Sequence, residues 1–321
     1  MKIYNTTLKN LDKASILIKK GGIVAFPTET VYGLGALASD SKSINRIYKI
    51  KKRPKNNPLI VHIHNIDLLN SIVECVPDFA YELMKNFWPG PLTLIFPYKN
   101  SGSVDTIARA SLNTVAVRLP NNPIALKFLE KVNLPVVAPS ANISQQLSPT
   151  KAIHVQNDLG SRLDPLRDMI LDGGNCNLGI ESTVIDLTSE RPNILRLGGL
   201  SSFKINKTLK INININKKQK GKYKSPGMMK KHYAPKTEMR LNANKPLTGE
   251  VWLGFGAEKT NVKVKKENLS LKGNIEEAAV NLYSMLRKLD NYKAKKIAVA
   301  KIPNDGMGEA INDRLKKGAT K

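Results

Sequence analysis

Hydrophobic and polar positions in the first 200 residues alternate between helical and strand spacing. Leu8, Leu11 and Leu17 lie at the spacing of an amphipathic helix, which the glycine at 21 would end. Further helices are predicted from helical spacing at 43–53, DFAYELMKNF (78–87) and IALKFLEKV (124–132). Strands are predicted from apolar runs at IVAFP (23–27), LIVHI (59–63), LTLIF (92–96), TVAVRL (114–119), PVVAP (135–139), MILD (169–172), STVIDL (182–187) and NILRL (193–197). This order predicts an α/β fold with a substantial mixed sheet.

The pattern changes after about residue 203. Residues 203–224 are polar, rich in lysine and without periodicity, which is typical of a linker. Beyond them, strands are predicted at VWLGFG (251–256) and KIAVAKIP (296–303), and helices at 276–289 and 308–317. A chain of 321 residues is also long for one core. We therefore expect a first domain over 1–205, a linker over 206–236 and a smaller α/β domain, Rossmann-like, over 237–321.

Composition excludes several classes of protein. The two cysteines lie far apart, which excludes a disulfide framework and a cysteine-based zinc site and fits a reducing compartment. The N-terminus lacks the apolar core of a signal peptide, and no apolar run has the length of a membrane span. We expect a soluble, cytoplasmic protein that does not enter a membrane.

The net charge of +25 resembles that of nucleic-acid-binding proteins. Residues 1–200 carry 23 basic against 16 acidic side chains, and the remaining residues carry 28 against 10. The excess is mostly lysine within Lys/Asn/Ile-rich text, which AT-rich codons would produce without selection for binding. Weak contact with tRNA stays open, and charge alone does not identify the function.

The common catalytic motifs are absent from the sequence. There is no Walker-type loop, no G-x-G-x-x-G after a strand, no HExxH and no G-x-S-x-G. The pairs Gly33-Leu34-Gly35 and Gly254-Phe255-Gly256 are more typical of tight turns than of nucleotide sites. No grouping of His, Cys and carboxylates predicts a metal site.

The stretch KKRPKNNP, residues 51–58, places four cations directly before the predicted strand at 59–63. It is a solvated loop, a nucleic-acid contact or a clamp for the phosphates of a small nucleotide. Pro54 and Pro58 stiffen it, which lowers the entropic cost of holding a ligand. Arginine suits phosphate oxygens with a planar fork and lysine with a point charge. The sequence favours the nucleotide clamp.

Polar side chains also follow several predicted strands, where open α/β sheets bind ligands. Thr28, Glu29 and Thr30 form either a hydrogen-bonded turn or part of a site. His62 and His64 share one strand face, as structural residues or as ligands. For the arginine at 118, on an otherwise apolar strand, the alternatives are an internal ion pair and a partner from outside. Small polar or cationic groups follow other strands at Ser140, Asn142, Ser182 and Arg196.

Long stretches of the chain resemble a known family. FPTETVYGLGA, KKRPKNNPLIVHI, WPGPLTLIF, TVAVRLP, APSAN followed by SPT, and GIESTVID are similar to the YrdC-type domain. With SPGMMKKHYAP and GEAINDRL, the chain resembles the two-domain threonylcarbamoyl-adenylate synthases from about residue 21 to residue 314. The resemblance implies a twisted, open α/β sheet with a positively charged concave face.

The resemblance also implies a reaction. L-threonine, bicarbonate and ATP would give threonylcarbamoyl-AMP and pyrophosphate, and a partner transferase would modify a tRNA adenosine beside the anticodon. Mg²⁺ is expected on the ATP, without a dedicated protein site. By position in the motifs, the residues would be Thr30, His62, Arg118, Ala138 and Ser182 for L-threonine; Arg53, Asn57, Thr114, Ser140, Ser148, Arg196, His232 and Tyr233 for ATP; and Lys51 with Arg53, and Ser140 with Asn142, around the phosphates.

The stretch SPGMMKKHYAP is either a linker turn or, as in the resembled family, a lid over the site. The chain also departs from the family pattern. Lys52 and Gln145 stand where glycine is usual, Lys230 and Lys231 replace Tyr and Arg in the lid, and the last domain is short. Lysine in place of glycine at 52 would strain the loop if that position needs a positive φ.

Two other functions remain as alternatives. A non-catalytic protein of the same fold would bind double-stranded RNA or tRNA through its basic face. The threonine-pocket residues at 30, 62, 118 and 182 speak against it, because RNA binding does not need them. A carbamoyl-transfer module is the other alternative, but related modules belong to larger chains with metal-binding parts that this sequence lacks.

Overall fold

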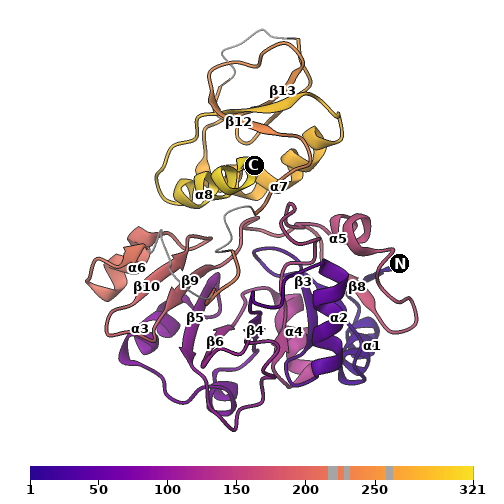
Figure 1. Cartoon of the computed structure of the whole chain (residues 1–321), viewed down its shortest axis with the longest axis vertical. Coiled ribbons are helices and arrows are strands. Elements are labelled where there is room, and N and C mark those ends of the chain that lie inside the picture. Colours follow the sequence, from indigo (N-terminus) through magenta and orange to yellow (C-terminus); the bar gives the residue numbers. More distant parts are fainter. Residues whose placement is uncertain (216–222, 228–231, 258–262, 321) are drawn as a thin grey trace.

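The computed structural model describes residues 1–215, 223–227, 232–257 and 263–320. In these residues the chain forms two α/β units, each with its own sheet. The larger unit contains the N-terminus, and the smaller unit stands above it in Figure 1. No helix in the described ranges is long and apolar enough to cross a membrane.

The large sheet is mixed, as expected. Its described strands are β1 (Ile3–Asn5), β2 (Val24–Phe26), β3 (Gly33–Leu37), β4 (Ile60–His62), β5 (Leu92–Pro97), β6 (Thr114–Arg118), β7 (Val136–Val137), β8 (Met169–Asp172), β9 (Thr183–Asp186), β10 (Asn193–Arg196) and β11 (Asn214–Ile215). They follow the order β1-β8-β2-β3-β7-β4-β6-β5-β9-β10-β11. The sheet contains parallel pairs such as β4–β6 and antiparallel pairs such as β5–β6. The predicted turn at Gly33-Leu34-Gly35 is instead part of strand β3.

Helices cover the sheet where the sequence has apolar residues at helical spacing. They are α1 (Leu8–Lys19), α2 (Ser41–Lys51), α3 (Asp78–Phe87), α4 (Pro123–Val132) and α5 (Ala152–Leu159), with a 3₁₀ turn over Ile66–Ser71. Polar side chains at Thr7, Asp40 and Asn122 cap the first turns of α1, α2 and α4. Helices α1 and α4 pack against each other. The four helices predicted in the first 200 residues are therefore confirmed as α1 to α4, and α3 forms without a side-chain cap.

The predicted linker contains regular structure that the sequence did not indicate. Helix α6 (Ser202–Leu209) begins at the Ser201 cap, and β11 pairs in parallel with β10. Ile205 of α6 is fully buried, and α6 packs against α3. This lysine-rich sequence therefore forms a helix that its local pattern does not predict, because only one of its residues, Ile205, is fully buried. Residues 216–222 and 228–231, including Lys230 and Lys231, lie outside the described residues.

The smaller unit has a four-stranded parallel sheet. Its described elements are β12 (Met239–Ala243), β13 (Glu250–Gly254), β14 (Lys266–Asn268), β15 (Lys296–Ala300), α7 (Ile275–Asp290) and α8 (Gly308–Ala319). The strand order is β12-β15-β13-β14. In chain order this is first, fourth, second, third, whereas the Rossmann sheet begins with the order third, second, first, fourth. The Rossmann-like detail is therefore not confirmed.

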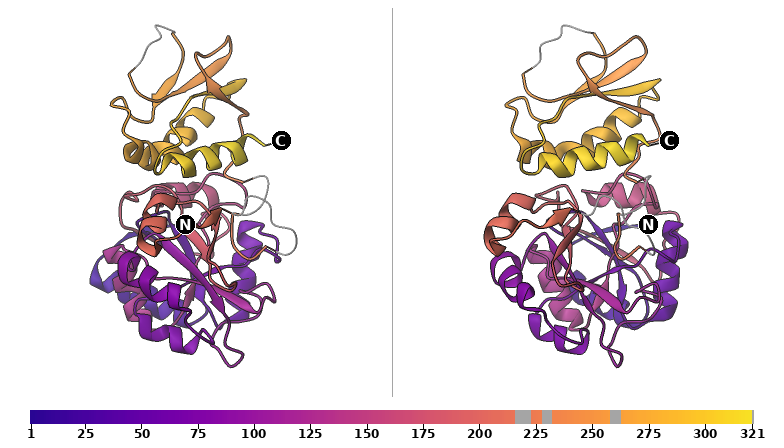
Figure 2. Two further views of the ribbon diagram at one scale, coloured as in Figure 1. Left: turned by 90° about the vertical axis from the view of Figure 1, so that its left-hand side faces the viewer. Right: turned by 60° about the vertical axis from the view of Figure 1, so that its left-hand side comes forward.

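Helices α7 and α8 lie between the small sheet and the large unit (Figures 1 and 2). Their apolar faces form one buried cluster with the small sheet. The same cluster includes Val31, Leu147 and Ile180 of the large unit. The two units thus share a buried apolar contact, and α8 is placed close to the loops that precede β9.

Candidate functional site

A pocket lies over one face of the large sheet, with a cavity volume of about 40 Å³ that is open on one side to solvent. Ile60 and His62 are two residues apart in β4, so both side chains face it. The parallel register aligns His62 with Arg118 at the end of β6. The full lining is Thr28, Thr30, Val31, Gly33, Arg53, Ile60, His62, Arg118, Ala138, Pro139, Ser140, Glu181, Ser182, Arg196, Pro226, His232 and Tyr233.

All five residues predicted for L-threonine line this cavity, which brings Thr30, His62, Arg118, Ala138 and Ser182 together. They come from five segments that are distant in the sequence. Of the residues predicted for ATP, the cavity is lined by Arg53, Ser140, Arg196, His232 and Tyr233. The two predicted groups therefore share one cavity.

The side chain of Arg118 is 4% exposed and forms an ion pair within the protein. Its Nη2 lies 2.7 Å from Glu29 Oε1, and its Nη1 donates a hydrogen bond of 2.9 Å to Thr30 Oγ1. Its Nε donates to the Gly90 carbonyl at 3.2 Å. The internal ion pair considered from the sequence is thus present. It also fixes the guanidinium in one orientation at the cavity wall.

His62 is neutral at physiological pH. Burial, and then the nearby Arg118, lower the pKa of His62 to about 3. Its Nδ1 lies 3.3 Å from the Ile60 carbonyl, and a carbonyl only accepts, so Nδ1 carries the proton. The other ring nitrogen, Nε2, is then an acceptor. His64 is half-buried beyond the end of β4 and does not line the cavity.

Arg53 and Arg196 are further cations in the cavity lining. Arg53 donates to the carbonyls of Asn57 at 3.1 Å and Pro58 at 2.8 Å. Burial lowers the pKa of Arg53 to about 10, so it stays charged at neutral pH. Arg196 donates to the Ser182 carbonyl and hydroxyl, each at 3.0 Å. The proline-stiffened loop thus holds an arginine at the cavity through its own carbonyls.

Lys51 was predicted to lie around the phosphates, and that role stays a prediction. It is 1% exposed and is not among the lining residues. Its ammonium donates to the carbonyls of Ser140 and, at 2.6 Å, of Asn142. Ser140 Oγ in turn donates to Asn142 Oδ1 at 2.6 Å. In the described structure, Lys51 and Asn142 therefore shape the loop that presents Ser140.

Three other predicted ATP residues lie outside the lining. Asn57 is buried, and its carbonyl accepts from Arg53. Thr114 is at the opposite end of β6 from Arg118. Ser148 is fully buried and donates to Glu181 Oε1 at 2.5 Å. Their proposed contacts with ATP stay predictions.

The segment at 225–227 and 232–233 closes one side of the cavity. Arg196 Nη1 donates to the Pro226 carbonyl at 3.3 Å, and the His232 and Tyr233 rings lie 3.9 Å apart. Burial lowers the pKa of His232 to about 3. Gly227 has a φ of +86°, and a Cβ there would lie 2.6 Å from the Tyr233 hydroxyl. Glycine is therefore required where this segment turns towards the cavity.

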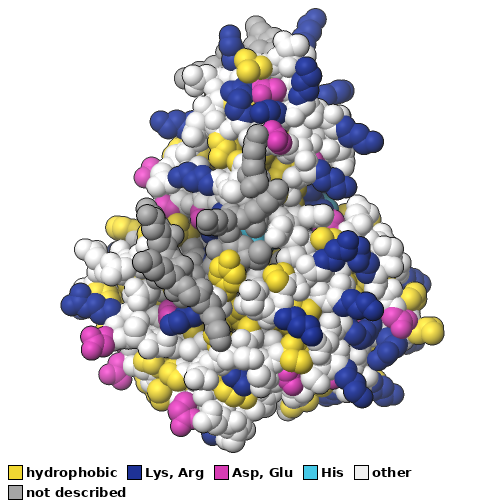
Figure 3. All heavy atoms as spheres, in the orientation of Figure 1, with side chains coloured by type: hydrophobic (Ala, Val, Ile, Leu, Met, Phe, Trp, Pro, Cys, Tyr) yellow, Lys and Arg dark blue, Asp and Glu magenta, His cyan; other side chains and the backbone are white. Residues whose placement is uncertain are grey.

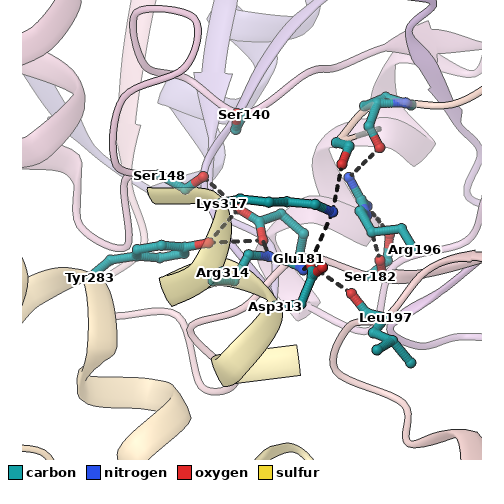
Figure 4. A network of polar contacts seen from close by, with 12 residues as sticks. Ser140, Ser148, Glu181, Ser182, Arg196, Leu197, Tyr283, Asp313, Arg314 and Lys317 are labelled. Atoms are coloured by element: carbon teal, nitrogen blue, oxygen red, sulfur yellow. Dashed lines mark hydrogen bonds and ion pairs between the residues drawn. The ribbon is translucent and has the colours of Figure 1, made fainter. Parts of the chain in front are cut away.

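The sequence reasoning missed Glu181 as a lining residue and Arg314 as its partner. Arg314 of α8 donates from Nε to Glu181 Oε2 at 2.8 Å (Figure 4). Both residues lie within stretches that carry the family resemblance, which was the available signal. Spacing could not reveal the pair, because 133 positions separate them.

Comparisons with known proteins agree with this geometry. Residues 16–198 match a family model described as "Telomere recombination", the Sua5, YciO and YrdC group, and residues 200–320 match one described as "Threonylcarbamoyl-AMP synthase, C-terminal domain". A threonylcarbamoyl-AMP synthase of Pyrococcus abyssi is 39% identical over 95% of this chain and 93% of its own length. One of Bacillus subtilis is 37% identical over 98% and 94%.

A solved structure is similar over both units. The crystal structure of P. abyssi Sua5 complexed with L-threonine superposes with a TM-score of 0.91 at 36% identity. The match covers 99% of this chain and 98% of that chain. The α/β fold and the arrangement of its two units are therefore those of that structure.

Proposed function

The chain belongs to the threonylcarbamoyl-AMP synthase family, and on that premise we propose that its cavity joins L-threonine, bicarbonate and ATP into threonylcarbamoyl-AMP and pyrophosphate. The observation that carries the proposal is the shared cavity, because the residues predicted for threonine and most of those predicted for ATP line it together. The product would pass to a transferase that modifies tRNA.

The threonine carboxylate would bind at Arg118, whose guanidinium Glu29 and Thr30 already orient. The amine nitrogen would bond to the carbon of CO₂ derived from bicarbonate and release a proton. His62 Nε2, as an unprotonated acceptor, is suited to receive a hydrogen bond from the amine or the hydroxyl of the substrate. Ala138 and Ser182 would bound the remaining space.

A carbamate oxygen would then bond to the α-phosphorus of ATP while the bond from that phosphorus to pyrophosphate breaks. Such transfers depend on positioning and on stabilisation of developing charge. Arg53 and Arg196 are preorganised for that task by carbonyl acceptors of the protein. No covalent protein nucleophile is required.

Mg²⁺ would enter on the phosphates of ATP. Within the described ranges, no group of three or more His, Cys, Asp or Glu side chains could form a metal cage. The carboxylates nearest the cavity, Glu29 and Glu181, are each paired with an arginine. The donor set therefore fits an ion held mainly by substrate oxygens and water.

The segment that carries His232 and Tyr233 would act as a lid. Both rings line the cavity and are almost fully buried. A closed lid would protect the mixed anhydride product from hydrolysis. A Tyr233→Ala variant should release more of the intermediate as hydrolysis products, and unchanged release would contradict this role.

Pyrophosphate release by the purified chain tests the proposed function. Release from ATP should require both L-threonine and bicarbonate. Omission of either substrate serves as the control. Release without threonine would indicate a different acceptor. Absence of release under all conditions, together with tight tRNA binding, would favour the RNA-binding alternative.

A further inference from the structure

The two units meet at a buried carboxylate, Glu181, which lies just before β9 and lines the cavity. Its Oε1 accepts from Ser148 Oγ at 2.5 Å, and its Oε2 accepts from Arg314 Nε at 2.8 Å. The Tyr283 hydroxyl lies 3.1 and 3.0 Å from the two oxygens (Figure 4). The large unit thus supplies the carboxylate, and α7 and α8 supply two of its three partners.

Arg314 reaches the cavity only through other residues. Its side chain is 1% exposed and is not among the lining residues. Its Nη2 donates to the Leu197 carbonyl at 2.8 Å, and its guanidinium lies 4.6 Å from the centre of the Tyr233 ring. It therefore contacts two cavity-lining side chains, Glu181 and Tyr233, from behind.

The charge of Glu181 depends on this contact. Burial alone would raise the pKa of Glu181, but Arg314 and Arg196, with hydrogen bonds from Ser148 and Arg314, lower it to about 2. The carboxylate is therefore ionised at neutral pH. Without Arg314, a buried negative charge would stand unpaired at the wall of a cavity proposed to hold a triphosphate.

We propose that Arg314 is a positioning residue, which neutralises Glu181 from behind and turns its carboxylate away from an anionic nucleotide in the cavity. The inference rests on the proposed function for its substrate class. It gives the C-terminal unit a definite role, since α8 supplies the countercharge for a residue of the large unit. Lys317, one turn further along α8, donates to the Gly227 carbonyl at 2.9 Å and brings the lid segment to the same helix.

The probe is an ATP analogue with a methylene group between the α- and β-phosphates, added with Mg²⁺ to the full chain and measured by calorimetry. It needs no turnover. Arg314→Met should weaken its binding about 10- to 100-fold, because an unpaired charge then faces the phosphates. Glu181→Gln added to Arg314→Met should restore affinity to within about fivefold of the native chain, since the repulsive charge is gone.

The matched control is Asp158→Asn. Asp158 of α5 pairs with Arg287 of α7 at 2.6 Å, a second and only partly buried ion pair between the units, and does not line the cavity. Its loss should change nucleotide affinity by less than about threefold. If Arg314→Met does not fold, Arg314→Lys, which keeps the charge, and the double variant still test the proposal, and both should bind nearly as the native chain does.

Three results would overturn the proposal, and each has a distinct meaning. Equal losses of nucleotide affinity in Arg314→Met and Asp158→Asn would show that Arg314 acts only by holding the two units together. Failure of Glu181→Gln to restore binding would show that repulsion by its charge is not the cause. No binding by the native chain would overturn the proposed function itself and, with it, this inference.

Discussion

Protein groups hold the cavity's charged side chains in place before any substrate enters. Arg118 pairs with Glu29, Arg53 donates to two carbonyls of its own loop, and Arg196 donates to Ser182. A charged group held in place needs little reorganisation when charge develops on a substrate. Activity should therefore respond to the groups that orient the arginines as well as to the arginines themselves.

Glu29→Gln tests this directly for the threonine side. Glu29 is buried at 2.7 Å from Arg118, so its neutralisation removes the negative charge that pairs with the guanidinium. We expect KM for L-threonine to rise about tenfold, with a smaller change in kcat. Steady-state kinetics of pyrophosphate release measures both. Glu130→Gln, at an exposed carboxylate of α4, is the control and should leave KM unchanged. An unaltered KM in Glu29→Gln would contradict the orienting role.

The buried histidines predict a loss of stability in mild acid. Burial lowers the pKa of His62 and of His232 from 6.5 to about 3, so the unfolded chain takes up protons that the folded chain refuses. The stability contributed by the neutral rings is complete above pH 6.5 and declines as pH falls towards 3. Each histidine should cost about 1.4 kcal/mol per pH unit in that window.

Urea unfolding at pH 7.5 and pH 5.5 measures the effect. The native chain should lose more stability between these values than His62→Gln, which has one histidine fewer to protonate on unfolding. His64→Gln removes a half-buried ring and is the comparison. Its loss of stability between the two pH values should lie closer to that of the native chain than the loss in His62→Gln does. Parallel losses in the native chain and in His62→Gln would contradict the prediction.

At the scale of elements, the two positions where glycine is usual in the resembled family both have a positive φ. Lys52, the C-cap of α2, has φ 51° and ψ 42°, and Gln145 has φ 71°. The left-handed conformation costs a residue with a Cβ about 1 kcal/mol relative to glycine. The sequence had raised this possibility for Lys52, and the observed φ confirms that the position needs it.

Lys52→Gly should therefore stabilise the chain by about 0.5–1 kcal/mol, because glycine caps a helix in this conformation without strain. The free energy of unfolding in urea measures the gain. Lys49→Gly, at an exposed position inside the same helix, should instead cost about 1 kcal/mol. If both variants lost stability to the same degree, strain at Lys52 would not be the cause.

Elements with strong periodicity could be predicted from the sequence, and those defined by tertiary contacts could not. Strands such as β5 and β6 and helix α7 were indicated by apolar spacing and end signals. Helix α6 was missed, because its lysine- and asparagine-rich sequence fully buries only Ile205, with Leu209 partly buried against the same cluster. The two-residue strand β11 is fixed only by pairing with β10, which no local pattern encodes.

The same limit applies to the site. The motifs indicated which residues gather in the cavity, but not which way each side chain faces. Lys51, in a motif typical of phosphate binding, donates to two backbone carbonyls in the described structure. Whether a cation faces a cavity or a carbonyl depends on the loop opposite, at 140–142, which lies about 90 positions away in the sequence.

On the scale of the whole molecule, the net charge of +25 does not gather into one patch on the face seen in Figure 3. Lys and Arg side chains are scattered over both units there, with Asp and Glu among them. Several cations are committed to internal partners, such as Arg314 to Glu181 and Arg287 to Asp158. Such pairs cancel within the net charge, so other Lys and Arg side chains carry the excess of +25.

The interface between the units predicts that they unfold together. It combines an apolar cluster, to which Val31, Leu147 and Ile180 of the large unit contribute, with the buried ion pair of Arg314 and the partly buried ion pair of Arg287. Separating the units would expose this cluster and leave buried charges unpaired, which costs several kcal/mol. Neither unit should then be stable at a denaturant concentration that unfolds the other.

The sequence contains two tryptophans, one in each unit, and this allows a direct measurement. Trp88 is buried in the large core and Trp252 in β13 of the small sheet. In Trp252→Phe, fluorescence reports unfolding of the large unit, and in Trp88→Phe it reports the small unit. Because each substitution shifts stability slightly, circular dichroism of each variant provides the reference. Fluorescence and circular dichroism should give one coincident urea transition in both variants. A fluorescence transition separated from that of circular dichroism would mean that the units unfold independently and that the Glu181–Arg314 contact couples them only weakly.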